Sequence, residues 1–371
     1  QLTKDTAEII VYLQLAKMNN GATVKTKFNK GLRWWKKVVE NKSNNNPYRF
    51  DNYSYELYNK LELDLNNIKQ TSFDKIKLLK PFGFVLNNID SVTEAKPFLP
   101  VFLTESLSDY YYSNNPYKVR EEIKAVQTNG IKNETVLQFV GGISQKINAY
   151  DNYCNLFGKE FISPLSISGD KYYNYKGADT QTIAGDKFYH LYFSPKHEGE
   201  NTFTGDCWIH STTWAIQKIT LHTAPTANIN FVNRLSIIQE FALNNAKQWV
   251  IAKDKVVADL SPFKKDKLSF IGRKTATYKN VQVNQSLTNT ILAKNKKKEE
   301  VIIREDALVQ NNKFWNEHRH EGLSKNEAKV YQMIDTLKHL PLFKKYANTL
   351  EFITDGHKKF GMIEIGPWFK W

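Results

Sequence analysis

Alternation of apolar and polar residues is the main pattern in this chain, and it predicts a sheet. Residues 48–70 give the longest example. One face of that segment would hold Tyr53, Tyr55, Leu57, Asn59, Leu61, Leu63 and Leu65. The other would hold Glu56, Lys60, Glu62 and Asp64. A period of two over this length predicts an antiparallel strand with one face in solvent.

Further strand patterns recur at short spacing, most densely after residue 170. They are predicted at residues 6–17, 100–116, 170–195 (two strands), 201–223 (a hairpin), 227–260 (three strands) and 356–371 (one strand with aromatic ends). Short polar turns separate most of them, which predicts a meandering antiparallel sheet.

Helical spacing is less frequent. Helices are predicted at residues 30–42, 73–90, 118–130, 133–158 and 323–341. The first has Leu32, Trp35, Val38 and Val39 on one side and ends at the turn-forming residues 43–47. The last begins with a capping box of Ser324 and Glu327 and is closed by Pro341.

The chain carries a formal net charge of +14. Such an excess favours an acidic partner, which could be nucleic acid, an anionic membrane surface or an acidic glycan. The densest basic run, Lys294–Lys298, is followed directly by two glutamates and lies within polar residues 263–312, so we expect a solvated linker there. Zinc-finger spacing, RNA-binding signatures and basic heptad helices are all missing, and the sequence therefore gives no support for nucleic-acid binding.

Only two cysteines are present, Cys154 and Cys207. They could pair if both face one core in an oxidising compartment, or they could be small buried apolar residues. The chain starts at Gln1, as expected of a mature or trimmed chain. It contains neither a signal segment nor an apolar run long enough for a membrane-spanning helix.

Candidate chemistry is sparse. The segments "HEGEN" and "HEGLS" lack the second histidine of a zinc-protease helix, and "HRH" at residues 318–320 has no third ligand nearby. Cys207 and His210 lie three residues apart on a predicted strand, where their side chains point to opposite faces. We therefore predict no catalytic residue, no metal, no cofactor and no enzymatic activity.

Residues 187–241 and three further segments resemble one known family. The further segments are residues 46–68, residues 361–371, and residues 314–338 with the motif residues Trp315, Arg319, Ser324, Glu327 and Asp335. The family comprises large Bacteroidota outer-membrane β-barrel proteins of unknown function with a carboxypeptidase-regulatory-like N-terminal domain. A weaker likeness, of pattern only, joins the hairpin "GDCWIHSTTWAI" to lipoprotein-carrier (LolA-like) half-barrels.

The resemblance implies a fold of class α+β: a large curved antiparallel sheet, half-barrel-like and packed with helices, with a C-terminal helical segment leading to a transmembrane barrel beyond this chain. The implied units are a tail strand of an upstream β-sandwich (1–20), a helical connector (21–47), the sheet domain (48–262), a Lys-rich linker (263–322), and a helix and first strand leading to the barrel (323–371).

Two functions are compatible with this pattern, both at the periplasmic face of the outer membrane. The first is a non-enzymatic scaffold or docking surface for envelope protein partners. The second is a module that binds a lipid, an acyl chain or a lipoprotein on its curved sheet. Its expected lining is aromatic: Tyr189, Tyr192, Phe193, Trp208, Trp214, Phe231 and Phe241. Those aromatic residues could equally form an ordinary core.

Overall fold

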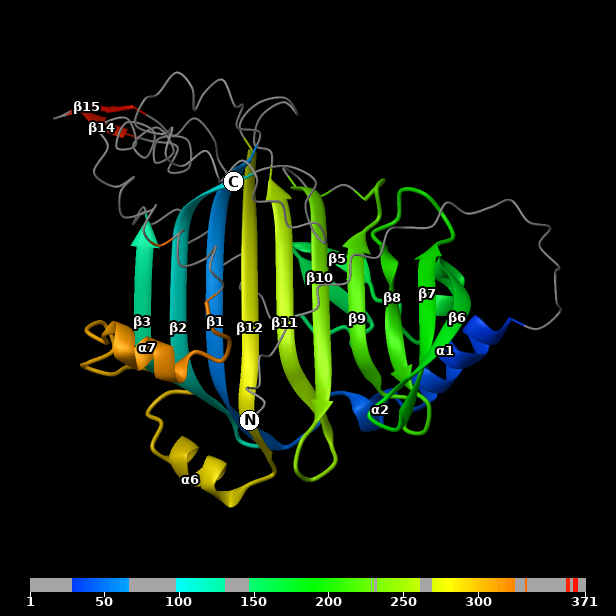
Figure 1. Ribbon diagram of the computed structural model, residues 1–371, viewed down its shortest axis with the longest axis horizontal. Helices are drawn as coiled ribbons and strands as arrows, with labels where there is room; N and C mark the ends of the chain where they lie inside the picture. The colour runs from blue at the N-terminus through cyan, green and yellow to red at the C-terminus, as the bar shows by residue number, and fades with distance from the viewer. Residues whose placement is uncertain are drawn as a thin grey trace, which may run out of the picture.

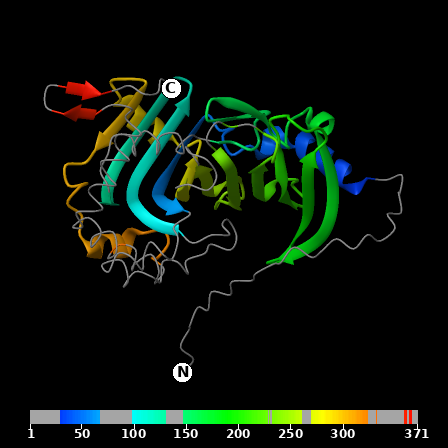
Figure 2. The ribbon, with the colours of Figure 1, turned by 90° about the horizontal axis from the view of Figure 1, so that it is seen from above.

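The computed structural model describes residues 29–66, 98–130, 147–227, 229, 232–260, 269–323, 331, 358–360 and 363–365. Most of these residues belong to one sheet of eleven strands in the order β13-β3-β2-β1-β12-β11-β10-β9-β8-β7-β6 (Figure 1). All neighbours in it are antiparallel except β13 and β3, which are parallel. Seen along its strands the sheet is curved and open (Figure 2). The predicted large curved antiparallel sheet is therefore confirmed.

The strands are long, and four of them exceed twelve residues. Their bounds are β1 Asn52–Asn66, β2 Phe98–Asn114, β3 Tyr117–Gly130, β6 Tyr173–Ile183, β7 Asp186–Pro195, β8 Phe203–His210, β9 Ile216–Thr223, β10 Val232–Leu243, β11 Trp249–Leu260, β12 Ser269–Val283 and β13 Glu299–Ile303. Two small hairpins lie outside this sheet: β4 Tyr153–Leu156 with β5 Lys159–Ile162, and β14 Lys358–Phe360 with β15 Ile363–Ile365.

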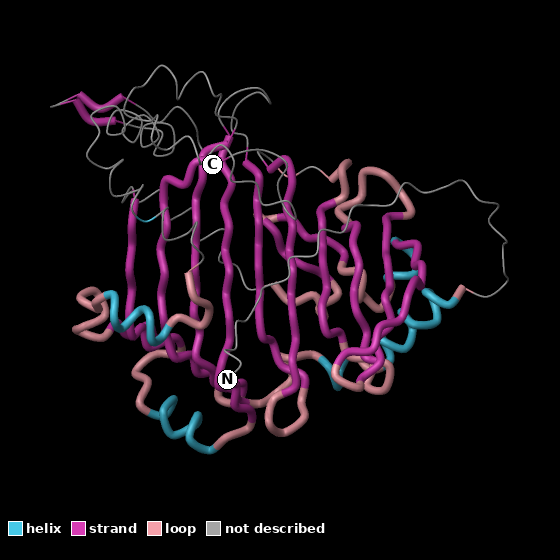
Figure 3. Tube along the Cα trace, viewed as in Figure 1, coloured by secondary structure: helices cyan, strands magenta, loops and turns pink. Residues whose placement is uncertain are grey.

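The helices are short and peripheral (Figure 3). They are α1 Lys30–Glu40, α2 Lys42–Asn45, α5 Gly169–Tyr172, α6 Ser286–Ala293 and α7 Asn312–His318. Asn29 directly precedes α1, and its side chain caps the helix by accepting a hydrogen bond from the N–H of Leu32. Among the described residues, no helix is both long and apolar enough to cross a bilayer.

Cross-strand pairs share a face, so the register divides the sheet into two faces. The face that contacts α1, called the α1 face below, holds Leu61 of β1, Leu191 of β7 and Cys207 of β8. The opposite face, called the α7 face, holds Tyr58 of β1 and Leu107 of β2, which pack against Trp315 of α7.

The main core lies on the α1 face under β6–β11. Helix α1 and residues 147–166 cover the sheet there. Buried side chains in this core include Trp35, Tyr150, Phe161, Leu165, Tyr173, Tyr175, Leu191, Phe193, Phe203, Ile209 and Phe241. A second cluster on the same face pairs tyrosines across β1 and β2: the rings of Tyr53 and Tyr112 lie 4.6 Å apart, and those of Tyr55 and Tyr110 lie 4.9 Å apart.

Several predictions of secondary structure were wrong. Residues 118–130 form strand β3 and not a helix. Residues 269–283, predicted as linker, form β12 between β1 and β11. Residues 232–260 hold two strands, and Ile229 adds only an isolated bridge. The described part of residues 133–158 contains β4 and no helix, and the C-terminal strand is the hairpin of β14 and β15.

The solvent face predicted for β1 is also wrong in part. The side chain of Asp64 is buried and pairs with Arg273 of β12, and Glu56 contacts both Lys124 and His320. Residues 6–17 and 73–90 lie outside the described residues, as does all of 323–341 except Leu323 and the helical Tyr331. The division of the chain into units stays a prediction.

Candidate binding surfaces

The hairpin of β8 and β9 contains no catalytic pair. Cys207 is fully buried on the α1 face, and burial raises the pKa of its thiol well above the usual value. His210 lies at the other end of β8, where its Nδ1 is 2.8 Å from Oγ1 of Thr213 in the turn. The hairpin is thus part of the sheet, as predicted.

The two cysteines are not joined. Both Cys154 and Cys207 are buried free thiols. Burial, followed by the charge of Asp151, raises the pKa of Cys154 to about 12. At that pKa the thiol is a poor source of thiolate, so Cys154 behaves as a small apolar residue.

The seven predicted lining residues do not form one wall. Tyr189 and Trp214 lie on the α1 face near α1, with ring centroids 5.7 Å apart. A third ring completes this group: Trp34 of α1 stacks on Tyr189 at 4.7 Å. Trp34 had no place in the predicted site, although the doublet of Trp34 and Trp35 on one helix was a usable signal.

Two of the predicted residues are ordinary core. Phe193 and Phe241 are each 3% exposed, and both belong to the packed cluster under β6–β11. Phe231 lies outside the described residues.

The last two lie on the opposite side of the sheet. Trp208 stacks on His190 at 4.0 Å, and Tyr192 lies 4.3 Å from the same imidazole. His190 Nε2 is 2.9 Å from Oδ2 of Asp206. Tyr192 is 44% exposed, so this group forms part of the surface of the α7 face.

A buried acid interrupts the α1 face near the middle of the sheet. Asp254 of β11 is 3% exposed, and its Oδ1 has no hydrogen-bond partner. Burial raises the pKa of Asp254 to about 6, against the opposing effects of Lys274 and Gln239. The side chain of Gln239 holds residues 147–149 against the sheet. Its Nε2 donates to the carbonyl of Ile147 at 2.8 Å, and its Oε1 accepts from the N–H of Ala149 at 3.0 Å.

Asp254 was not among the predicted site residues, although the sequence pattern of β11 contains a signal for it. In β11 the positions 254, 256, 258 and 260 share a face and hold one aspartate among Val256, Ala258 and Leu260. An acid at an apolar position of a strand indicates either a paired or a titrating group.

Two of the family-motif residues anchor the segment after α7 to the sheet. Glu105 of β2 is fully buried and receives two hydrogen bonds from Arg319, from Nε and Nη2, each 2.9 Å long. Tyr58 and Tyr331 donate to the same carboxylate. Burial alone would raise the pKa of Glu105, but the bonds from Arg319, Tyr331 and Tyr58 together lower it. Trp315 is buried beside this group, with the Arg319 guanidinium 5.6 Å from its ring. The remaining motif residues, Ser324, Glu327 and Asp335, lie outside the described residues.

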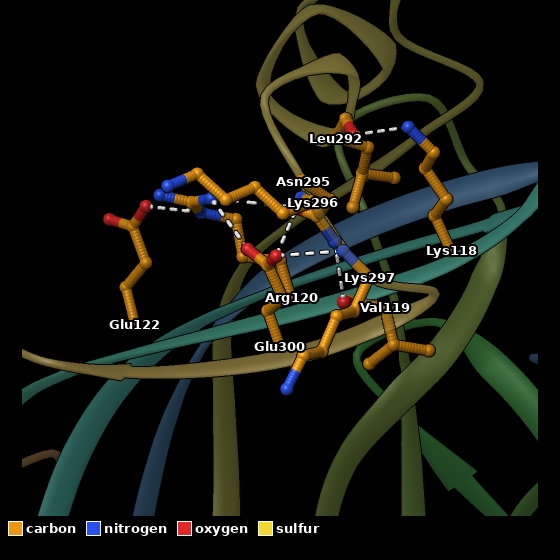
Figure 4. A network of polar contacts seen from close by, with 9 residues as sticks. All are labelled: Lys118, Val119, Arg120, Glu122, Leu292, Asn295, Lys296, Lys297 and Glu300. Atoms are coloured by element: carbon orange, nitrogen blue, oxygen red, sulfur yellow. Dashed lines mark hydrogen bonds and ion pairs between the residues drawn. The ribbon is translucent and has the colours of Figure 1, made fainter.

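The lysine run Lys294–Lys298 is an ordered loop between α6 and β13 (Figure 4). Oε1 of Glu300 accepts hydrogen bonds from the backbone N–H groups of Lys296 (2.6 Å) and Lys297 (2.9 Å). These bonds, that of Lys297 first, lower the pKa of Glu300. The expected solvated linker is therefore replaced by a fixed loop, although its lysine side chains remain exposed.

Strand β3 holds the other side of this loop. Asn295 donates to the carbonyl of Val119 at 2.8 Å, and the N–H of Val119 donates to the carbonyl of Lys298 at 2.7 Å. Arg120 contacts both Asn295 (3.3 Å) and Glu300 (3.6 Å). The Nε of Arg120 also donates a hydrogen bond to Glu122. The carboxylates of Glu122 and Glu300 therefore bind Arg120 and backbone N–H groups, and not the lysine side chains (Figure 4).

Metal chemistry has no support in the described ranges. They contain no group of three or more His, Cys, Asp or Glu side chains placed to hold a metal ion. The two imidazoles of "HRH" have other contacts: His318 binds the carbonyl of Phe314, and His320 lies between Thr277 and Glu56.

A family model described as a family of unknown function, DUF5686, matches residues 36–281. The chain belongs to this family. The DUF5686 match begins within α1 and ends within β12, so it includes the strand β12 that was predicted as linker and excludes the basic loop. No curated protein matches the chain.

Solved structures show weak similarity to this DUF5686 chain. One is a DUF1329 family protein from Desulfovibrio piger, with 9% identity and a TM-score of 0.29, covering 71% of this chain and 98% of its own. A domain assigned to outer-membrane lipoprotein sorting, from Vibrio parahaemolyticus, has 8% identity, a TM-score of 0.29 and coverages of 71% and 100%. A LolA superfamily protein from Nitrosomonas europaea has 9% identity, a TM-score of 0.24 and coverages of 69% and 96%.

Proposed function

We propose that this chain is a non-enzymatic docking module in the periplasmic part of an outer-membrane protein. The observation that supports the proposal best is the filled α1 face. Under β6–β11, where most of the lipid-lining residues were expected, side chains of α1 and of residues 147–166 pack against the sheet. Phe193 and Phe241, expected to line a lipid site, pack within that core.

The cellular setting of the proposal comes from the sequence resemblance. Segments 46–68, 187–241, 314–338 and 361–371 resemble Bacteroidota outer-membrane proteins with a carboxypeptidase-regulatory-like domain. On that basis we infer a β-sandwich upstream and a membrane barrel downstream of this chain. The module would then lie at the periplasmic face of the outer membrane, where its surface is available to envelope partners.

A docking surface needs accessible groups on a rigid support, and the described residues provide both. The α7 face presents Tyr192 and Trp208, and the loop Lys294–Lys298 presents four lysines on a backbone fixed by Glu300. Catalysis by a thiol would need an accessible cysteine beside a base. The two thiols are instead buried and protonated, and His210 is used within its own turn.

Native mass spectrometry of the purified chain, with organic extraction of whatever co-purifies, tests the proposal. We expect the mass of the bare protein and no stoichiometric lipid. A matched measurement adds a fluorescent fatty acid to the wild-type chain and to Trp214→Ala, which changes the partly exposed end of the aromatic group. Saturable binding to the wild type that is weakened in this variant would overturn the docking role and support a lipid carrier.

A further inference from the structure

The basic loop Lys294–Lys298 and helix α6 together form an exposed surface. The proposed docking function does not yet name a partner for this surface. Helix α6 projects beyond the ends of β1 and β2 and lies at one extremity of the molecule (Figure 1). Its inward positions are Thr288 and Leu292, both buried. Its outward side contains Leu287, which is 67% exposed, and Ile291 one turn later. Lys294 follows at the next position on that side, since residues three and four apart share a helix face.

The loop adds three more exposed cations directly after Lys294. Lys296, Lys297 and Lys298 are all exposed, and Figure 4 shows the side chains of Lys296 and Lys297 extending out from the loop. None of the four ammonium groups forms an ion pair within the described residues, because the carboxylate of Glu300 binds backbone N–H groups and Arg120 instead. The neighbouring Glu299 is exposed and accepts a hydrogen bond from Tyr117 at 2.5 Å.

The loop backbone is held before any partner arrives. Lys118 donates to the carbonyl of Leu292 at 3.0 Å, which ties the end of α6 to β3. Asn295 and Lys298 form hydrogen bonds with Val119 and so flank Lys296 and Lys297. A partner would therefore meet preordered cations and would not have to order a flexible loop, which lowers the cost of binding.

We propose that the outward side of α6 and the loop Lys294–Lys298 bind the headgroups of an anionic phospholipid bilayer. The inference rests on the proposed docking role and names the partner of one docking surface. Clusters of four or more basic residues beside an amphipathic helix are typical of contacts with anionic lipid. Leu287 and Ile291 supply apolar side chains for the headgroup boundary, while lysine stems extend along it.

The composition of the surface favours a bilayer over an acidic protein. Protein interfaces are enriched in arginine and aromatic residues and depleted in lysine. Here every exposed cation of the loop is a lysine, and the apolar residues beside them are aliphatic. A convex helix-and-loop tip also fits a flat, fluid surface, which needs no matching pocket.

Co-sedimentation of the full chain with vesicles tests the inference. Vesicles of phosphatidylcholine alone are compared with vesicles that also contain phosphatidylglycerol. We expect binding only with the anionic lipid, and we expect it to weaken as salt is added, because exposed charges are screened. This salt series uses the wild-type chain, so it does not depend on the folding of any variant.

The loop variant changes Lys294, Lys296, Lys297 and Lys298 to glutamine and should lose at least about tenfold in affinity for anionic vesicles. The matched control changes four other exposed lysines, Lys36, Lys171, Lys176 and Lys313, to glutamine. Because the net charge falls equally in both variants, the control should stay within about twofold of the wild type. Leu287→Ser should lose about threefold without any change in charge.

Three outcomes would overturn the inference. One is equal binding to both kinds of vesicle. Another is an equal loss of affinity for anionic vesicles in the loop variant and in the control variant with four other lysines changed. The third is absence of vesicle binding together with binding to soluble polyglutamate, which would assign the loop to an acidic protein segment and leave the docking role intact. By contrast, transfer of labelled lipid from the vesicles into the supernatant with the protein would overturn the proposed docking role itself.

Discussion

At the scale of single residues, the buried ion pairs bind distant parts of the chain to the sheet. Glu105 and Arg319 are 214 positions apart, and Asp64 and Arg273 join β1 to β12. A buried pair of this kind adds little net stability compared with an apolar pair of the same size, but breaking it leaves an uncompensated charge. Such residues are therefore sensitive to single substitutions.

Arg319→Met should destabilise the chain by about 3 to 5 kcal/mol, because it leaves the Glu105 carboxylate buried without its cation. Equilibrium unfolding in urea measures the difference. Lys253→Met is the matched control, since Lys253 pairs with Glu321 at 2.6 Å but the two side chains are 31% and 49% exposed. We expect no more than about 1 kcal/mol from that exposed pair. Equal losses in the two variants would contradict a structural role for the motif arginine.

Asp254 should make stability depend on pH. Its pKa is raised from 3.8 to about 6 by burial. The folded state then binds more protons than the unfolded state between these two values, so stability falls as the pH rises through that window. A shift of this size corresponds to roughly 3 kcal/mol.

Asp254→Asn removes the titrating group. The variant should have a larger free energy of unfolding than the wild type at high pH, because it buries no charged carboxylate there. We expect the variant to gain stability over the wild type when both are compared at about pH 7.5, and to lose about half of that gain at about pH 5. Lys274 on β12 and the phenols of Tyr48 and Tyr278 face the same carboxylate, and the variant leaves all three residues unchanged. A stability difference that is the same at both pH values would show that Asp254 does not titrate in this window.

At the scale of elements, the sequence predicted the helix α1 and most strands of the β6–β11 half, where patterns are local. It failed for β3, whose apolar residues Val119, Ile123 and Val126 also fit a helical spacing. In the sheet the charges between them are neutralised by distant partners: Lys124 binds Glu56 of β1 and Asp109 of β2. Those partners are far away in the sequence, so the spacing of apolar residues within the segment alone led to the wrong prediction of a helix.

The same reason explains why β12 was taken for linker. Arg273 and Lys274 make the segment look polar, yet Arg273 pairs with Asp64, and Lys274 is 9% exposed. Seven aromatic residues were predicted to line a lipid site, but nothing in the sequence showed which face of the sheet α1 would fill. Strand parity already separates Tyr189 from Tyr192, which lie three residues apart on β7, but only the packing of α1 shows that the face with Tyr189 is the covered one.

The contact between α1 and β6 depends on two glycines. A Cβ placed on Gly31 would lie 2.5 Å from the backbone N of Gly177 and 2.8 Å from backbone atoms of Lys176. Gly31→Ala should therefore push α1 from the sheet and cost about 1 to 3 kcal/mol. The stack of Trp34 on Tyr189 should loosen as well, which near-ultraviolet circular dichroism detects together with a lower thermal midpoint.

Gly322→Ala is the control for this substitution, because a Cβ there meets nothing within 4 Å. It should leave both the spectrum and the thermal midpoint close to those of the wild type. If Gly31→Ala behaved in the same way, the close approach of α1 to β6 would not exist in solution.

At the scale of the whole molecule, the order of strands makes the sheet one unit. Strand β1 pairs with β2 on one side and with β12 on the other, although β12 is more than 200 residues later in the chain. Strand β12 also pairs with β11. It therefore joins the half built from β1–β3 to the half built from β6–β11, and the two halves share no other strand pairing in the described sheet.

A fragment that ends at residue 262 should consequently fail to fold cooperatively, because it lacks β12 and exposes the open edges of β1 and β11 in the middle of the sheet. A fragment that ends at residue 323 keeps all eleven strands and should unfold in a single transition. Far- and near-ultraviolet circular dichroism followed through urea unfolding compare the two. If the shorter fragment kept the strand signal and one cooperative transition, the halves would be independent domains, and the segment after residue 262 would be the linker that its composition suggested.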